Sequence, residues 1–230
     1  MNKDLLSTIC GPSIKLMNKL SYPAKITIIA SLVLVMSGSI IAFLLNNLDT
    51  QANFSIKEQH GVEYINPLKD LLLNLRKTKD KNTTITTETI TQNVNSVDNQ
   101  DKKYNKEMKV ENTWNDLKND LSGFKYSQLD DLITRTSASI DNVTNQSNLI
   151  LDPDLDTYYL MDSYCLRFAN IMGKIFDLKQ NGLNKINKQP FSQLDLIKTN
   201  VLLDEQNEIL KANLAVIYGF NPSTKAVLDE

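Results

Sequence analysis

Uncharged and mostly apolar residues run from Ile26 to Leu45, in the segment ITIIASLVLVMSGSIIAFLL, which contains no charged residue. As an α-helix this segment would be about 30 Å long, the thickness of the hydrocarbon core of a bilayer. The pattern therefore predicts a transmembrane helix over residues 26–45. A cleaved signal peptide is the alternative, although its apolar core is usually shorter and Thr50-Gln51-Ala52 resembles a cleavage site only weakly.

Beyond this segment the apolar residues recur at steps of three and four, the period of an α-helix. The first helix should continue to about Lys79, with a kink at Pro67 because proline removes a backbone hydrogen bond. A second helix is expected over residues 86–121. Its apolar stripe is interrupted by the polar Asp101, and the phase of the stripe slips before Val110.

A third helix is expected to follow, with a heptad repeat in which apolar or small residues alternate steps of four and three. These residues are Leu129, Ile133, Thr136, Ile140, Val143, Ser147 and Ile150. Because Thr136 and Ser147 are polar, the repeat is typical of a helical bundle rather than of a strong coiled coil.

The sequence Asp152-Pro153-Asp154 is predicted to begin a fourth helix. Asp152 can cap it, Pro153 suits its first turn, and Asp154 favours the positive end of the helix dipole. This helix is expected to end at about residue 181, followed by a loop over residues 182–190. A fifth helix is expected over residues 191–218, and the start of a further, truncated helix within residues 223–230.

The charges of the chain predict its orientation and exclude one class of protein. Residues 1–25 contain four lysines and one aspartate, whereas acidic residues outnumber basic ones in the rest of the chain. Positive charge next to a crossing stays in the cytoplasm, so residues 1–25 form a cytoplasmic lead-in and residues 46–222 an external domain. The mixed, mildly acidic charge of that domain argues against binding to nucleic acid.

The two cysteines, Cys10 and Cys165, fall on opposite sides of the predicted membrane and cannot form a disulfide with each other. Cys165 lies among apolar residues, so a small buried side chain is expected there, with a bridge between two copies of the chain as the alternative. The sparse Gly and Pro (7 and 6 residues) argue against a turn-rich all-β fold.

Two segments carry a resemblance to a known family. They are GVEYINPLKDLLLNLR at Gly61–Arg76 and SNLILDPDLDTYYLMD at Ser147–Asp162. Both resemble the extracytoplasmic sensor region of bacterial transmembrane receptors, chiefly methyl-accepting chemotaxis proteins. The first segment departs from the family pattern after Arg76, where Lys77 stands in place of a glycine. The resemblance implies an all-α fold, with one transmembrane helix leading into an antiparallel helical bundle, either one four-helix unit or two stacked ones.

The resemblance also implies a function. The external domain would be a periplasmic ligand-sensing module in the inner membrane of a bacterium, acting as a homodimer, with the signalling output domain outside this chain. A membrane-anchored helical spacer or assembly protein and a receptor fragment without a signalling role are the alternatives. The ligand would be a small organic acid or amino acid, and no cofactor is expected.

Candidate ligand-binding residues are the three arginines and two tyrosines of the external domain, because a guanidinium matches a carboxylate in shape and charge. They are Arg76, Arg135, Arg167, Tyr158 and Tyr159. Ion pairs between helices and positions in the core are the alternative roles. His60, the one histidine, lacks partners at the spacing of a metal site. No nucleophile–base pair or phosphate loop occurs in the sequence, so we expect neither a catalytic nor a metal site.

Overall fold

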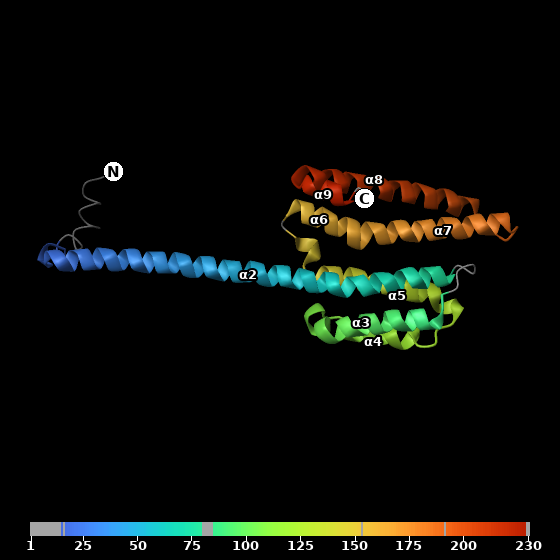
Figure 1. The fold of residues 1–230 in the computed structure, drawn as a ribbon, viewed down its shortest axis with the longest axis horizontal. Coiled ribbons are helices and arrows are strands. Elements are labelled where there is room, and N and C mark those ends of the chain that lie inside the picture. The colour runs from blue at the N-terminus through green and yellow to red at the C-terminus, as the bar shows by residue number, and fades with distance from the viewer. Residues whose placement is uncertain (1–14, 16, 80–84, 153, 191, 229–230) are drawn as a thin grey trace. The chain divides into compact units, whose positions relative to one another are not determined.

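The computed structural model describes residues 15, 17–79, 85–152, 154–190 and 192–228 (Figure 1). These residues are mostly helical and include no β-strand, so the prediction of an all-α fold is confirmed. The chain divides into two compact units, Met1–Asn53 and Phe54–Glu230. Most of the lead-in, residues 1–14 and 16, lies outside the described residues.

Helix α2 runs from Tyr22 to Lys79, as predicted. Its helical backbone continues on both sides of Pro67. Every residue from Ile26 to Leu45 is exposed, and the most apolar stretch of the helix has a mean hydropathy of 2.6. Within the described part of the chain, α2 is the one helix long and apolar enough to cross a membrane.

The predicted second helix is in fact two helices, α3 (Thr87–Met108) and α4 (Glu111–Leu121). They are separated at Lys109, which has a φ of 53° in the left-handed region that ends helices. The prediction of one helix was therefore wrong, and the break coincides with the phase slip before Val110. Thr86 caps α3, because its side-chain oxygen accepts a hydrogen bond from the Thr89 amide at 3.2 Å.

The third helix, α5, spans Leu129–Gln146 and is flanked by the short 3₁₀ helices η1 (Tyr126–Gln128) and η2 (Leu149–Leu151). The predicted heptad repeat ran to Ile150, but α5 ends at Gln146. The helix cannot continue because Asn148 adopts a left-handed φ of 68°. The polar heptad residues Thr136 and Ser147 are both buried. Each satisfies its hydroxyl by donating to a backbone carbonyl of its own helix.

The fourth predicted helix consists of three consecutive parts, α6 (Leu155–Met161), the π-helix η3 (Asp162–Arg167) and α7 (Phe168–Ile186). Asp154, rather than Asp152, occupies the N-cap position. Asp152 instead accepts a hydrogen bond from the Asp154 amide at 2.9 Å. Pro153, expected in the first turn, lies outside the described residues.

The loop predicted over residues 182–190 begins too early, since α7 continues through Gly182 to Ile186. Glycine costs about 1 kcal/mol in a helix, which by itself does not end one. Helix α8 (Gln193–Phe220) packs against α7, and its N-cap Ser192 accepts a hydrogen bond from the Asp195 amide at 3.1 Å. Helix α9 (Ser223–Leu228) is the further helix that the sequence predicts.

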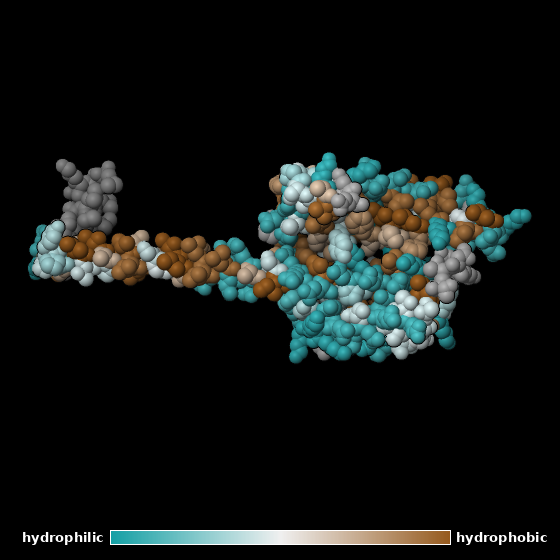
Figure 2. Space-filling model, viewed as in Figure 1, coloured by the Kyte–Doolittle hydropathy of each residue, from teal (hydrophilic) through white to brown (hydrophobic). Residues whose placement is uncertain are grey.

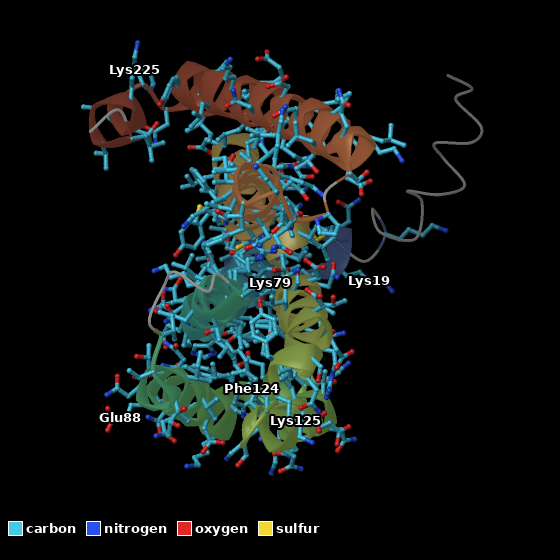
Figure 3. The ribbon with its side chains drawn as sticks, turned by 90° about the vertical axis from the view of Figure 1, so that its right-hand side faces the viewer. Lys19, Lys79, Glu88, Phe124, Lys125 and Lys225 are labelled. Carbon is cyan, nitrogen blue, oxygen red and sulfur yellow. The ribbon has the colours of Figure 1, made fainter. Side chains whose placement is uncertain are left out.

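The second unit is a set of helices lying side by side (Figures 1 and 3). Helices α3, α4 and α5 pack against one another, and α8 packs against α6 and α7. The part of α2 that belongs to this unit bonds to both groups, through Tyr64 to α3 and through Arg76 to α7.

Burial differs between the two groups of helices. The largest buried side chains are concentrated in α2, α3, α4 and α5: Tyr64, Ile65, Leu68, Leu71, Leu75, Met108, Trp114, Leu117, Leu129, Leu132 and Ile140. Helix α7 contributes no fully buried residue. The buried core of this unit is therefore centred on α2, and the α7–α8 side is more exposed to solvent.

Candidate functional site

Arg76 lies in the last turn of α2 with its guanidinium against the backbone of α7. Its Nη1 donates a hydrogen bond to the carbonyl of Ala169 at 2.6 Å. A Cβ added to Gly173 would lie 3.0 Å from Nη2, so glycine provides the room for this contact. Burial lowers the pKa of Arg76, against the opposing effect of Asp177, but a guanidinium stays charged at neutral pH.

One cavity beside Arg76 has a volume of about 440 Å³, and we refer to it as the charged cavity. Lys79, at the C-terminal end of α2 (Figure 3), lies at this cavity and forms an ion pair with Asp130 of α5 at 2.6 Å. The lining side chains come from α2, α5, α7 and α8, and the charged ones are Arg76, Lys79, Lys179, Lys198, Asp130, Asp177 and Asp195. The mixture of signs suits a small polar molecule that carries both kinds of charge.

A second cavity, of about 430 Å³, also has Arg76 in its lining, and we refer to it as the apolar groove. It lies between α2 on one side and η3 and α7 on the other. Its lining residues are Asn66, Lys69, Asp70, Leu72, Leu73, Arg76, Tyr164, Phe168, Ala169 and Met172. Arg76 therefore contributes to both cavities.

Lys69 is held in the apolar groove by Tyr164 of the π-helix. Its Nζ donates to the Tyr164 carbonyl at 2.7 Å and lies 3.0 Å from the centroid of the Tyr164 ring. The Tyr164 hydroxyl in turn donates to Oδ1 of Asn66 at 2.7 Å. Burial lowers the pKa of Lys69 to about 8, against the opposing effects of Cys165 and Asp70.

The π-helix itself is fixed by a buried polar cluster that contains Arg167. The guanidinium donates to both carboxylate oxygens of Asp162, at 2.9 and 3.2 Å, and to Gln206 of α8 at 3.3 Å. Asn213 of α8 also donates to Asp162, at 2.7 Å, and to Ser163 at 3.2 Å. These bonds connect η3 to α8, and Arg167 also lines a further cavity of about 410 Å³.

The five candidate residues do not come together at one site. Arg135 forms ion pairs with Asp120 of α4 and, at 3.4 Å, with Asp131 of its own helix. Tyr158 and Tyr159 pack edge to face with ring centroids 5.3 Å apart. Of the five, Arg76 is the one placed at the two largest cavities described here.

Three residues at these cavities were not predicted from the sequence as site residues: Lys69, Tyr164 and Gly173. A signal for Lys69 does exist, because Lys69 and Arg76 are seven residues apart, which is two helical turns and therefore the same side of α2. Gly173 carried no signal, since glycine within a helix has several explanations. Tyr164 depends on the π-helix, which no apolar period reveals.

Glu58 lies at a third cavity, of about 370 Å³, whose other lining residues include Asp152, Met161 and Cys165. Its Oε1 atom is buried and has no hydrogen-bond partner among the described residues. Burial and the nearby Asp152 and Asp154 raise the pKa of Glu58 to about 7. In the part of the chain that the structure describes, no three acidic, His or Cys side chains are grouped as metal ligands.

No protein-family model matches this chain, and neither a curated protein nor a solved structure is significantly similar to it. The function must therefore be argued from the helix α2, the two cavities at Arg76 and the exposed surface.

Proposed function

We propose that this chain is the extracytoplasmic ligand-sensing module of a bacterial transmembrane signalling receptor of the chemotaxis type. One observation carries the proposal: a single helix, α2, contains both the exposed apolar segment Ile26–Leu45 and the cavity-lining residues Lys69 and Arg76. A ligand that binds preferentially to one packing of α2 against α7 would shift the population toward that packing. The change would then be passed along one helix into the membrane.

In this proposal α2 crosses the inner membrane once. Residues 1–25 lie in the cytoplasm, and residues 46–222 form an antiparallel helical bundle in the periplasm. The lysines before the apolar segment support this orientation, and the length of the segment supports the single crossing.

The orientation can be tested with single cysteines in the full chain carrying Cys10→Ser and Cys165→Ser. Asp49→Cys should react with a membrane-impermeant maleimide in spheroplasts. Lys19→Cys should react only after the membrane is permeabilised. The reverse pattern would contradict the proposed orientation.

We propose that two copies pair through α7 and α8. Exposed apolar side chains recur at helical spacing on both helices (Figure 2): Ile175 and Ile186 on α7, and Leu194, Ile197 and Val201 on α8. An apolar surface of this kind on a helix pair with few buried residues is typical of an interaction site. Anchoring in a membrane would raise the effective concentration of the second copy.

Ligand binding is tested on the full chain in nanodiscs by a melting scan against small organic acids and amino acids. A ligand at a hundred times its Kd stabilises the folded state by about 2.7 kcal/mol, which a melting curve resolves. Selective stabilisation by one class of compound supports a sensor. If no compound raises the melting temperature, the second candidate function, an anchored helical spacer, is favoured. The observation that supports the spacer is the Lys79–Asp130 ion pair, in which two charges of the cavity lining already neutralise each other.

A further inference from the structure

Two cations, Lys69 and Arg76, lie in the apolar groove and have no anionic partner among the residues that the structure describes. They are seven residues apart on α2, which places them about 10 Å apart along one side of the helix. Each donates its described hydrogen bond to a backbone carbonyl of the facing helix, that of Tyr164 or of Ala169. Among the described residues, no carboxylate lies within ion-pair distance of either group.

Burial makes this positive charge costly. Both groups are partly desolvated, which lowers the pKa of Lys69 to about 8 and that of Arg76 below its ordinary value. Asp70 and Asp177 act on them only at longer range. A bound anion would supply the missing partner, and charge-assisted hydrogen bonds are the stronger kind.

The rest of the groove is apolar. Leu72 and Leu73 line it from α2, and Phe168, Ala169 and Met172 line it from α7. Phe168 and Met172 are 45% and 36% exposed, so a ligand can reach them without opening the core. A volume of about 430 Å³ is in the range of small-molecule sites.

We infer that the apolar groove binds an organic monocarboxylate with an apolar body, such as a short aliphatic acid. The carboxylate accepts hydrogen bonds from Lys69 or Arg76, and the hydrocarbon contacts Phe168 and Met172. Asp70 at the groove disfavours a ligand with a second negative charge near Lys69. The inference names the ligand class of the proposed sensor, and its signalling role rests on that proposed function, although binding in the groove does not.

The inference is tested by calorimetry on the full chain in nanodiscs with four probes. Hexanoate has both the charge and the apolar body, hexanamide lacks the charge, acetate lacks the apolar body, and adipate adds a second carboxylate. Hexanoate should bind about tenfold more tightly than hexanamide or acetate, and more tightly than adipate. Its affinity should fall as the pH rises above about 8, because Lys69 then loses its proton.

Lys69→Met should weaken hexanoate binding about tenfold, whereas Lys77→Met, a matched change outside the groove on the same helix, should leave it unchanged. Phe168→Ser, at a partly exposed position, is a second variant that tests the apolar wall should Lys69→Met fail to fold. It should weaken hexanoate binding and leave acetate unchanged.

Three results would overturn the inference: equal binding of hexanamide and hexanoate, tighter binding of adipate than of hexanoate, or hexanoate binding unaffected by both variants. The proposed function would fail separately. Stabilisation by another small molecule in the melting scan would leave a sensor with a different ligand, whereas hexanoate binding without any change in the packing of α2 against α7 would leave the site without the sensor.

Discussion

Tyr64 of α2 donates its phenolic hydrogen to the carboxylate of Asp101 on α3 at 2.8 Å, and both side chains are buried. Asp101 is the residue that interrupts the apolar stripe of the second predicted helix. Burial and this hydrogen bond raise the pKa of Tyr64 well above its ordinary value. The interruption is therefore a specific polar contact between two helices rather than a defect in the pattern.

Tyr64→Phe should destabilise the protein by about 1–3 kcal/mol, because it leaves a buried carboxylate oxygen without its donor. Unfolding can be followed by the fluorescence of Trp114, the sole tryptophan, which is buried. Tyr126→Phe is the matched control: it removes an exposed hydrogen bond to the Lys79 carbonyl and should cost less than about 1 kcal/mol. Equal losses for the two variants would contradict the special role of the buried pair.

Gly61→Ala should be destabilising by about 1–3 kcal/mol, the usual cost of overpacking. A Cβ at Gly61 would lie 2.2 Å from Cβ of Ser147, the C-cap of α5, so one of the two backbones must move. The melting temperature of Gly61→Ala should rise when Ser147→Gly is added, because that change removes the opposing atoms.

Gly182→Ala should instead raise the free energy of unfolding by about 0.5–1 kcal/mol. Gly182 lies within α7, and an added Cβ there meets nothing within 4 Å.

Glu58→Gln should stabilise the protein near neutral pH and change its pH dependence. The pKa of Glu58 is about 7 in the folded protein and 4.5 in the unfolded chain, so ionisation of the unfolded chain weakens folding as the pH rises from 4.5 to 7. The gain should be absent at pH 4 and, discounted for solvent screening, reach about 1–2 kcal/mol at pH 8. Melting at both pH values measures it, with the exposed Glu205→Gln as control; a gain of equal size at both would contradict the argument.

Cys165 should be inert in the folded protein. It is 2% exposed, and burial raises the pKa of its thiol to about 11, so little thiolate is present at pH 8. In the Cys10→Ser chain, reaction with a disulfide reagent should be slow under native conditions and fast in denaturant. Rapid native labelling, or a disulfide-linked dimer, would instead favour the bridge between copies that the sequence left open.

The helices that the sequence predicted well are those with strong apolar periods. The long helix to Lys79 and the fifth helix depend on local pattern and capping, which one sequence contains. The break at Lys109 was visible only as a phase slip, because any residue can end a helix when packing requires it. The continuation of α7 through Gly182 could not be predicted, because a single glycine costs a helix only about 1 kcal/mol and so does not fix where it ends.

The candidate site was less predictable than the fold. Arg76 stood out by its chemistry, and it does line both cavities. Lys69 could not be distinguished from the other lysines in the sequence, because its role as a candidate ligand-binding residue depends on Tyr164, which faces it across the groove. Arg167 looked like a ligand residue by the same reasoning as Arg76, but Asp162 lies five residues before it and occupies its guanidinium.

The two segments that suggested a receptor, Gly61–Arg76 and Ser147–Asp162, meet in space at Gly61 and Ser147. That contact limits the size of the side chain that positions 61 and 147 can hold. Close packing of this kind suits a helical spacer as well as a sensor.

The π-helix at Asp162–Arg167 has a consequence for the evolution of this protein. A π-turn holds one residue more than an α-helical turn, so deleting a single codon there could restore a regular α-helix. Because the wide turn takes up the extra residue, Phe168 and Met172 would keep nearly the same direction after such a deletion. The same deletion in a regular turn of α7 before Met172 would rotate everything after it by about 100°. In a lineage descended from this gene, the π-helix is therefore the place in this helical segment where loss of one residue would disturb the direction of α7 least.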